Sequence, residues 1–295
     1  MKQPFPQYIL TGITFSVLWS SASIAGKFGL NSCEPLVFFT LRFLLAGGLL
    51  LTYSHVLNSQ RLPAGIEWKH LFIFGSFNTA LYLGIFIFAL QYITAGITAL
   101  AIALNPLFIS LMSSFLSRRK VTMVEWTSIL LGITGVFVAS FPLLNSKDIN
   151  IIGLLLLALS MITYSYGSVY YSTVQWKLDR VTINGWQVFI GGLIILPLAF
   201  AFHTRGNHFD ITFWVSLLWL IFPVSILAVQ LWLVLLKADA VRASIWLYLC
   251  PIFGLLFSSW LLHEPLTYYT LLGTILVLCA VFIGQRKITP PAKGS

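Results

Sequence analysis

Two stretches of the sequence, "SFLSRRKVTMVEW" at 114–126 and "SWLLHEPLTYYTL" at 259–271, are copies of one unit set 145 residues apart. Serines, threonines and apolar residues correspond along both copies, but the middle is RRK in the first copy and HEP in the second. A corner that changes its charge while its flanks are kept indicates two similar halves whose corners lie in different surroundings.

The repeat extends well beyond these corners. The same offset places "LRFLLAGGLLL" (41–51) on "WQVFIGGLIIL" (186–196), and "NPLFISLMSS" (105–114) on "CPIFGLLFSS" (250–259). Apolar residues match easily by chance, but glycines, prolines and serine pairs at one fixed offset do not. The sequence therefore predicts a first repeat at 1–147, a second repeat at 148–288 and a cytoplasmic tail at 289–295.

The composition is that of a chain surrounded by lipid. Charged residues make up 8% and hydrophobic residues 58% of the chain, and the mean hydropathy is +0.92, whereas about a quarter of the residues of a soluble domain are charged. Crossing a bilayer takes about 20 helical residues, and ten apolar runs are long enough. They lie at 8–30, 36–57, 71–90, 93–116, 124–143, 151–175, 182–202, 211–235, 243–262 and 267–285. We predict an all-α integral membrane protein of ten transmembrane helices.

Positive residues fall almost entirely on one side of this arrangement. Of the 17 Lys and Arg residues, 13 lie on the side of the termini, Lys147 and Arg205 lie on the other side, and Lys27 and Arg42 lie within spans. Because Lys and Arg loops stay in the cytoplasm, both termini are predicted to be cytoplasmic, in a multi-pass protein of the plasma membrane, the bacterial inner membrane. The net charge of +9 reflects this bias and not nucleic-acid binding, since the basic residues are scattered.

Five spans per repeat is an odd number, so the second repeat enters the membrane from the opposite side. The halves are then related by a pseudo-two-fold axis in the membrane plane. Two such halves can exchange conformations, which gives inward-open and outward-open states of similar energy and hence alternating access. The inversion also explains the two corners: RRK emerges in the cytoplasm and HEP outside.

Four further segments point to a family: "LWSSASIAGKFG" (18–29), "FFTLRFLLAG" (38–47), "ALQYITAGITALAIALNPLF" (89–108) and "LLHEPLTYYTLLGTILVLCAVFIG" (261–284). In them the chain resembles the EamA-type members of the drug/metabolite transporter superfamily, over nearly its whole length. It departs from the family at Ser20, where glycine is common, and at SRRKVT, where the first repeat often carries an acid. The resemblance implies two five-helix repeats, a substrate cavity built from helices 1, 3, 4, 6, 8 and 9, and export as the commoner direction.

Polar and aromatic side chains deep within the spans fall largely on those helices. Buried amides and hydroxyls need partners in lipid, and neighbouring helices, substrate or water can supply them. Interhelical packing is therefore the alternative for each residue. As a group, we predict that they line a central substrate cavity: Trp19, Ser20, Ser21, Asn78, Tyr82, Asn105, Tyr164, Tyr166, Gln187, Gln230, Trp246 and Tyr248.

Lys27 and Arg42 carry charge where charge is costly. One interpretation is that Lys27 extends to the headgroups while Arg42 pairs with an acid or with carbonyl groups. The functional hypothesis is a charged pathway in the outer half, with Glu34 at its outer end, in which Lys27 or Arg42 attracts a carboxylate of the substrate.

Pro106 and Pro251 occupy matched positions, and each frees the carbonyl group four residues earlier. They are either static kinks or a pair of symmetric bends that gate transport. All eight acidic residues fall in loops or at helix ends, so no mid-membrane carboxylate is available as a proton or sodium relay. This absence favours facilitated diffusion or exchange.

No cofactor, metal site or enzymatic activity is predicted, because Cys and His show no ligand spacing and the spans hold no Ser–His pair, paired Asp or His-Glu-x-x-His motif. The sequence predicts a secondary transporter, monomeric or homodimeric, that exports an amino acid or related amphipathic metabolite by alternating access. The alternatives are a facilitative channel and a non-transport protein such as a receptor or intramembrane enzyme. Saturable kinetics with trans-stimulation would distinguish a carrier from a channel.

Overall fold

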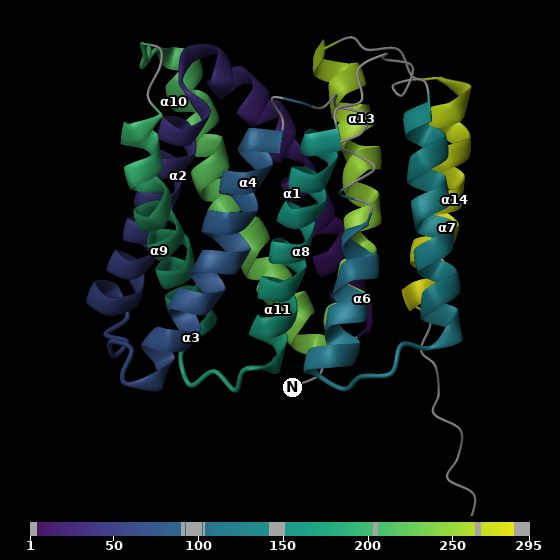
Figure 1. Ribbon diagram of the computed structural model, residues 1–295, viewed down its shortest axis with the longest axis horizontal. Helices are drawn as coiled ribbons and strands as arrows, with labels where there is room; N and C mark the ends of the chain where they lie inside the picture. Colours follow the sequence, from purple (N-terminus) through teal and green to yellow (C-terminus); the bar gives the residue numbers. More distant parts are fainter. Residues whose placement is uncertain are drawn as a thin grey trace, which may run out of the picture.

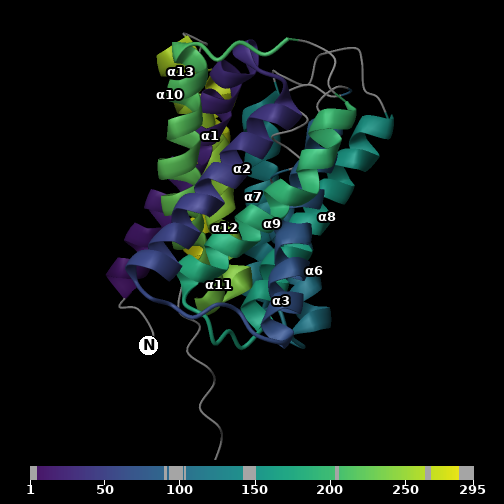
Figure 2. The ribbon, with the colours of Figure 1, turned by 90° about the vertical axis from the view of Figure 1, so that its left-hand side faces the viewer.

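The computed structural model describes residues 5–89, 92, 102, 104–141, 151–202, 206–262 and 267–285. These residues form helices and short connections, and no strand occurs among them. The helices run between the same two ends of one bundle (Figures 1 and 2). The predicted all-α architecture is confirmed.

The first repeat provides helices for the first five predicted spans. Its elements are α1 (Phe5–Ser32), α2 (Pro35–Leu51), the π-helical η1 (Thr52–Leu57), α3 (Ile66–Gly75), the π-helical η2 (Ser76–Leu81), α4 (Tyr82–Ala89), α6 (Asn105–Leu116) and α7 (Met123–Ser140). The second span consists of α2 and η1, and the third of α3, η2 and α4. Of the fourth span, residues 93–101 and 103 lie outside the described residues.

The second repeat follows the same order. Its elements are α8 (Ile151–Thr173), α9 (Arg180–Ala201), α10 (Ile211–Trp219), the π-helical η4 (Leu220–Ala228), α11 (Val229–Ala238), α12 (Ala240–Ile245), the 3₁₀ turn η5 (Trp246–Tyr248), α13 (Leu249–Leu262) and α14 (Tyr268–Gln285). The eighth span consists of α10, η4 and α11, and the ninth of α12, η5 and α13.

The length and composition of these helices suit a bilayer. Within the described residues, 6 helical stretches are long and apolar enough to cross a membrane, and shorter apolar helices accompany them at Asn105–Leu116, Met123–Ala139 and Tyr268–Gly284. Large apolar side chains on the outside, such as Phe115, Phe200 and Trp260, are more than 70% exposed. Lipid can cover such a surface, whereas water would not.

The two repeats pack about the predicted pseudo-two-fold axis. The second helices of the repeats pair with each other as α2 and α9, and the fifth helices pair as α7 and α14. The α7–α14 pair stands at one side of the bundle in Figure 1. The contact of α6 with α8 has its counterpart in the contact of α13 with α1. These contacts between the repeats are thus made from equivalent elements of the two halves.

Acidic side chains sit at helix ends, as predicted. Asp179, Asp210 and Asp239 accept hydrogen bonds from backbone N–H groups in the first turns of α9, α10 and α12, where unpaired N–H groups favour a carboxylate. Asp148 and Glu264 lie outside the described residues. In the part of the chain that is described, no carboxylate lies in the middle of a span.

Two π-helical turns occupy equivalent places in the repeats, since η4 lies on η2 when the second repeat is shifted by 145 residues. Pro223 within η4 lacks a backbone donor and is compatible with a widened turn. Such turns are often found at functional sites. Both of these turns carry residues of the polar network described below.

Candidate functional site

Five aromatic rings from four helices meet inside the bundle and form a central aromatic cluster: Phe15, Trp19, Tyr82, Tyr164 and Trp232. The ring centroids of Tyr82 and Tyr164 are 4.8 Å apart, and those of Phe15 and Trp232 are 4.9 Å apart. Tyr164 also stacks on Trp232 at 6.1 Å and approaches Trp19 to 6.3 Å. The structure thus brings together three of the predicted cavity residues, from α1, α4 and α8.

The cluster lies near the pseudo-two-fold axis, because Trp19 and Tyr164 are equivalent residues of the two repeats. Beside them, the Ser165 hydroxyl donates to Asn105 Oδ1 at 3.2 Å. The equivalent pair in the other half is Ser20 with Cys250, which also form a side-chain hydrogen bond. A solute at this point would contact both repeats in matching ways.

A second group of polar residues connects α2 and α9 to the π-helical turns of the opposite repeats. Gln187 accepts hydrogen bonds from Thr79 at 2.6 Å and from Asn78 at 3.3 Å. Its amide nitrogen donates to Asn184 Oδ1 at 3.1 Å, and Asn184 donates to the Ser225 carbonyl oxygen at 3.0 Å. The network is completed where Arg42 Nε donates to Ser225 Oγ at 2.8 Å. Arg42 therefore reaches η4, just as its equivalent, Gln187, reaches η2.

Arg42 is the one charged member of this network. It is 7% exposed, and its guanidinium carbon lies 5.2 Å from the centroid of Phe43 and 5.8 Å from that of Phe39. Within the described residues no carboxylate pairs with it, and Nη1 and Nη2 make no hydrogen bond. Tyr82 of the central aromatic cluster interacts electrostatically with the Arg42 guanidinium.

The end of the bundle where α1 ends and α10 begins is tied together by short polar contacts. The Glu34 backbone N–H donates to Asn207 Oδ1 at 2.8 Å, and the Ser32 hydroxyl donates to both carboxylate oxygens of Asp210. The Phe213 N–H and the Ser32 hydroxyl hold the pKa of Asp210 below its usual value. Lys27 is exposed near this end of α1. A role for Lys27 in a charged pathway stays a prediction.

Three other predicted cavity residues make contacts between helices. Ser21 accepts a hydrogen bond from Trp219 Nε1 at 2.9 Å, and Gln230 donates to the Arg180 carbonyl oxygen at 3.2 Å. The Tyr166 ring packs on Phe77, with centroids 4.6 Å apart. These contacts supply the partners that lipid cannot. A role for these residues in substrate binding stays a prediction.

Trp246 and Tyr248 are buried in the 3₁₀ turn η5, in the same apolar core as the central aromatic cluster. The Trp246 ring lies against Gly12 of α1, where an added Cβ would come within 2.1 Å of it. Tyr248 donates to the Ile129 carbonyl oxygen of α7 at 2.9 Å. Both residues therefore connect the ninth span to its neighbours.

The matched prolines begin helical segments. Pro106 lies in the first turn of α6, and Pro251 lies in the first turn of α13, directly after the 3₁₀ turn. In a first turn, the missing N–H of proline removes no intrahelical bond. A gating role for these prolines stays a prediction.

Sequence analysis missed several members of the site. Phe15 and Trp232 resemble any other aromatic residue of an apolar run, and Asn184, Ser225 and Thr79 are common residues in spans. Asn184 and Thr79 could have been found, because they lie within one helical turn of the predicted cavity residues Gln187 and Asn78. Nothing in the sequence distinguishes Ser225.

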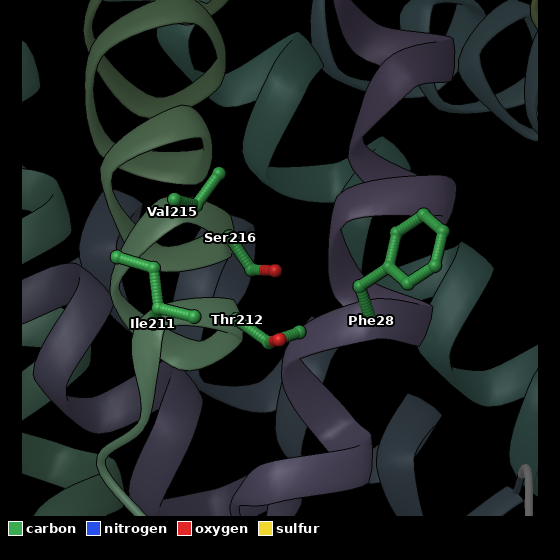
Figure 3. A pocket seen from close by; sticks show the side chains of 5 residues that line it. All are labelled: Phe28, Ile211, Thr212, Val215 and Ser216. Atoms are coloured by element: carbon green, nitrogen blue, oxygen red, sulfur yellow. The ribbon is translucent and has the colours of Figure 1, made fainter.

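Two cavities are described at the ends of the bundle. One of about 240 Å³ lies between α1 and α10, where Phe28 faces Ile211, Thr212, Val215 and Ser216 (Figure 3). The other, of about 340 Å³, lies at the opposite end and is lined partly by α3 and by the segment after α8. Neither cavity is lined by a predicted cavity residue.

Comparison with known proteins identifies the family of the chain. The EamA-like transporter family matches at residues 7–141 and again at 151–284. The chain belongs to this family. The resemblance predicted from the sequence is confirmed, and the double match agrees with the repeated architecture. The protein is thus a multi-pass membrane transporter and not an enzyme.

Relatives of this EamA-like transporter cover nearly its whole length. The "Uncharacterized transporter YoaV" of Bacillus subtilis (strain 168) is 25% identical and covers 94% of this chain and 97% of its own. "Protein PecM" of Dickeya dadantii (strain 3937) is 28% identical and covers 91% and 89%. A solved structure titled "Crystal structure of protein" has a TM-score of 0.80 at 18% identity and covers 94% and 96%. This last likeness shows the fold alone.

Proposed function

We propose that this EamA-like transporter exports a small amphipathic solute with a carboxylate group, an amino acid or a derivative of one, by alternating access. The observation that carries the proposal is Arg42, a buried guanidinium without a carboxylate partner in the described residues. Ser225 and two phenylalanine rings hold it in place, while Nη1 and Nη2 stay available. Two parallel N–H donors match the geometry of a carboxylate.

The central aromatic cluster supplies the apolar half of such a site. Tyr82 of the first repeat and Tyr164 of the second repeat lie against each other there. Tyr82 also interacts electrostatically with Arg42. Aromatic faces bind apolar side chains and also attract an ammonium group. A solute with a carboxylate at Arg42 and its remainder at the rings would touch both repeats, as a site used in both conformations requires.

The proposal includes no coupling ion, because no mid-span carboxylate occurs among the described residues. Facilitated diffusion or exchange is therefore favoured. The strong charge bias of the loops supports cytoplasmic termini in the bacterial plasma membrane, and the family resemblance favours export. Uptake into right-side-out vesicles that exceeds uptake into inside-out vesicles would contradict export, and pH-gradient dependence would contradict the absence of proton coupling.

The test uses purified protein in proteoliposomes with labelled amino acids and their uncharged amides. Wild type should prefer the acid to the amide, and Arg42→Gln should lose this preference. The affinity of Arg42→Gln for the acid should be roughly 10- to 100-fold weaker, because this is the effect of losing a charged hydrogen bond. Arg42→Lys should retain part of the preference. Lys27→Gln, which removes a cation at the outer end, is the control and should leave it unchanged.

Thermal unfolding in detergent shows whether each variant is folded. A folded Arg42→Gln variant that still prefers acids would reject the carboxylate site. Transport that does not saturate and shows no trans-stimulation would favour a channel instead.

A further inference from the structure

The 340 Å³ cavity lies at the end of the bundle where α3 begins and α8 ends (Figure 1). Its polar lining consists of Arg61, Glu67, His70, Gln175 and Lys177. Ile66, Val174 and Trp176 form apolar walls. This combination of cations and apolar walls at a helix end is unlike the central site, and the proposed transport does not use it.

The one acid of the cavity is already neutralised. Arg61 donates to both carboxylate oxygens of Glu67 at 2.6 Å, and the Ala64 N–H donates to Oε2 at 2.9 Å. The hydrogen bonds from Arg61 lower the pKa of Glu67 to about 2. The carboxylate therefore keeps its charge at neutral pH, but that charge is compensated by Arg61.

Lys177 is the second cation of the cavity; it helps to lower the pKa of Glu67, but it forms no ion pair with it. Its ammonium group has no hydrogen-bond or ion-pair partner in the described part of the chain. His70 adds a second available donor: its Nδ1 is 2.6 Å from the Tyr170 hydroxyl, and when Tyr170 donates this bond, the His70 proton lies on Nε2. The cavity thus holds one net positive charge and unused donors.

The surroundings are those of a membrane interface. Leu62 and Ile66 beside the cavity are 62% and 61% exposed, and Trp176 lies partly buried in its wall. Aromatic residues of this kind are enriched at headgroup level. Basic pockets between helices at the cytoplasmic side bind anionic headgroups. An acyl chain could follow the exposed apolar residues from such a pocket into the bilayer.

We propose that this cavity binds a singly charged phosphate group, supplied by the headgroup of an anionic phospholipid, with Lys177 as the contacting cation and His70 as a second donor. One uncompensated charge matches the single charge of a phosphodiester. A soluble phosphate compound would satisfy the same polar groups, but it would leave the exposed Leu62 and Ile66 without a partner.

The experiment measures lipid-dependent thermal stability of the full-length protein in detergent. Phosphatidylglycerol, phosphatidylcholine and inorganic phosphate are added separately. Wild type should be stabilised more by phosphatidylglycerol than by phosphatidylcholine, because only the former carries net charge. Lys177→Ala should weaken the apparent affinity for phosphatidylglycerol about fivefold, which corresponds to about 1 kcal/mol for one basic residue at an anionic surface.

Lys120→Ala is the matched control, since it removes an exposed lysine at the same end of the bundle but outside the cavity. Stabilisation by millimolar inorganic phosphate that depends on Lys177 would support the phosphate site but assign it to a soluble ligand. Equal stabilisation by both lipids, or equal losses in the two variants, would overturn the proposal. The readout does not involve transport, so its failure leaves the proposed function standing.

Discussion

Glu125 is the most deeply buried carboxylate among the described residues, with a side chain only 2% exposed. Arg119 donates to both of its oxygens, at 2.6 Å and 3.1 Å, and Arg242 Nε lies 3.8 Å from Oε1. Glu125 also completes a capping box with Thr122. One side chain therefore has two roles, the cap of α7 and the anionic centre of an ion cluster.

The charge of Glu125 should stabilise the fold separately from its capping role. In Glu125→Gln, the amide can still cap the helix, but the charged bonds to Arg119 are lost, at a cost of roughly 1–3 kcal/mol. Asp210→Asn is the control, because asparagine caps equally well and Asp210 has no Arg or Lys partner within the described residues. Thermal unfolding at pH 7 should show a much larger loss for Glu125→Gln than for Asp210→Asn.

The pH dependence of this difference follows from the pKa of Glu125. Burial raises that pKa, but hydrogen bonds from Arg119 and the Thr122 backbone outweigh burial, so the folded-state pKa lies below the usual value of a glutamate. The stabilisation is therefore fully present above about pH 4.5 and is lost as the pH falls through the folded-state pKa. The gap between wild type and Glu125→Gln should narrow in acid, and a gap that widens there would contradict this account.

Among the single residues, sequence analysis identified unusual side chains but not their partners. Arg42 was conspicuous as a charge in a span, and its contact with Ser225 came only with the structure. Trp19 and Tyr164 were both predicted to line the cavity, but neither their equivalence in the two repeats nor their contact was predicted. Which helix faces meet depends on rotations and crossings that a sequence period does not specify.

At the scale of elements, the tightest crossing is between α7 and α14. A Cβ on Gly273 would lie 2.4 Å from the Gly135 carbonyl oxygen and 2.6 Å from the Ala139 Cβ. Backbone and a second helix surround the position, so a larger residue cannot be accommodated by moving a flexible side chain. Small residues at a crossing let membrane helices approach closely.

Gly273→Val should therefore separate α7 from α14 and destabilise the protein by about 1–3 kcal/mol, the usual cost of overpacking. Thermal unfolding in detergent measures the loss. Gly48→Ala is the control for added helix propensity, since nothing lies within 4 Å of a Cβ at that position. Stability equal to wild type in Gly273→Val would show that the pair is not held by this contact.

The extents of the spans were predictable because bilayer thickness determines them. The predicted run at 182–202 corresponds to α9 at Arg180–Ala201, and the run at 267–285 to α14 at Tyr268–Gln285. The π-helical turns η2 and η4 and the 3₁₀ turn η5 were not predicted. Hydropathy reports only whether a residue prefers lipid, and these irregular turns are as apolar as regular helix.

At the scale of the whole molecule, the two repeats are joined by the same ion cluster at the end of the bundle where α6 ends and α12 begins. Arg119 belongs to the corner between α6 and α7, and it donates from Nε and Nη2 to Asp239, the cap of α12 in the other repeat, at 3.1 Å and 2.9 Å. The first corner, RRK, thus also holds the two repeats together. In an alternating-access carrier, such a contact between repeats must break when the cytoplasmic side opens.

Removing Arg119 should shift the protein towards the state that is open to the cytoplasm. Native Cys250 is a suitable reporter, because it is buried beside Ser20 near the central aromatic cluster. In a background with Cys33→Ser and Cys279→Ser, an impermeant maleimide is added to the cytoplasmic side of inside-out vesicles. Loss of about 1 kcal/mol of ion pairing corresponds to about a fivefold change in the population of the open state. Cys250 should therefore be labelled about fivefold faster in Arg119→Ala than in the parent.

Arg118→Ala separates this effect from a general loss of positive charge. Arg118 is the exposed neighbour of Arg119, and none of the ion pairs that the described residues form at this corner involves it. It should label at the parental rate. Faster labelling of both variants would mean that the corner acts through its overall charge, whereas unchanged labelling of Arg119→Ala would mean that the two repeats separate without breaking this contact. Faster labelling in Arg119→Ala together with a parental rate in Arg118→Ala would show that the contacts of Arg119 hold the two repeats together in the closed state.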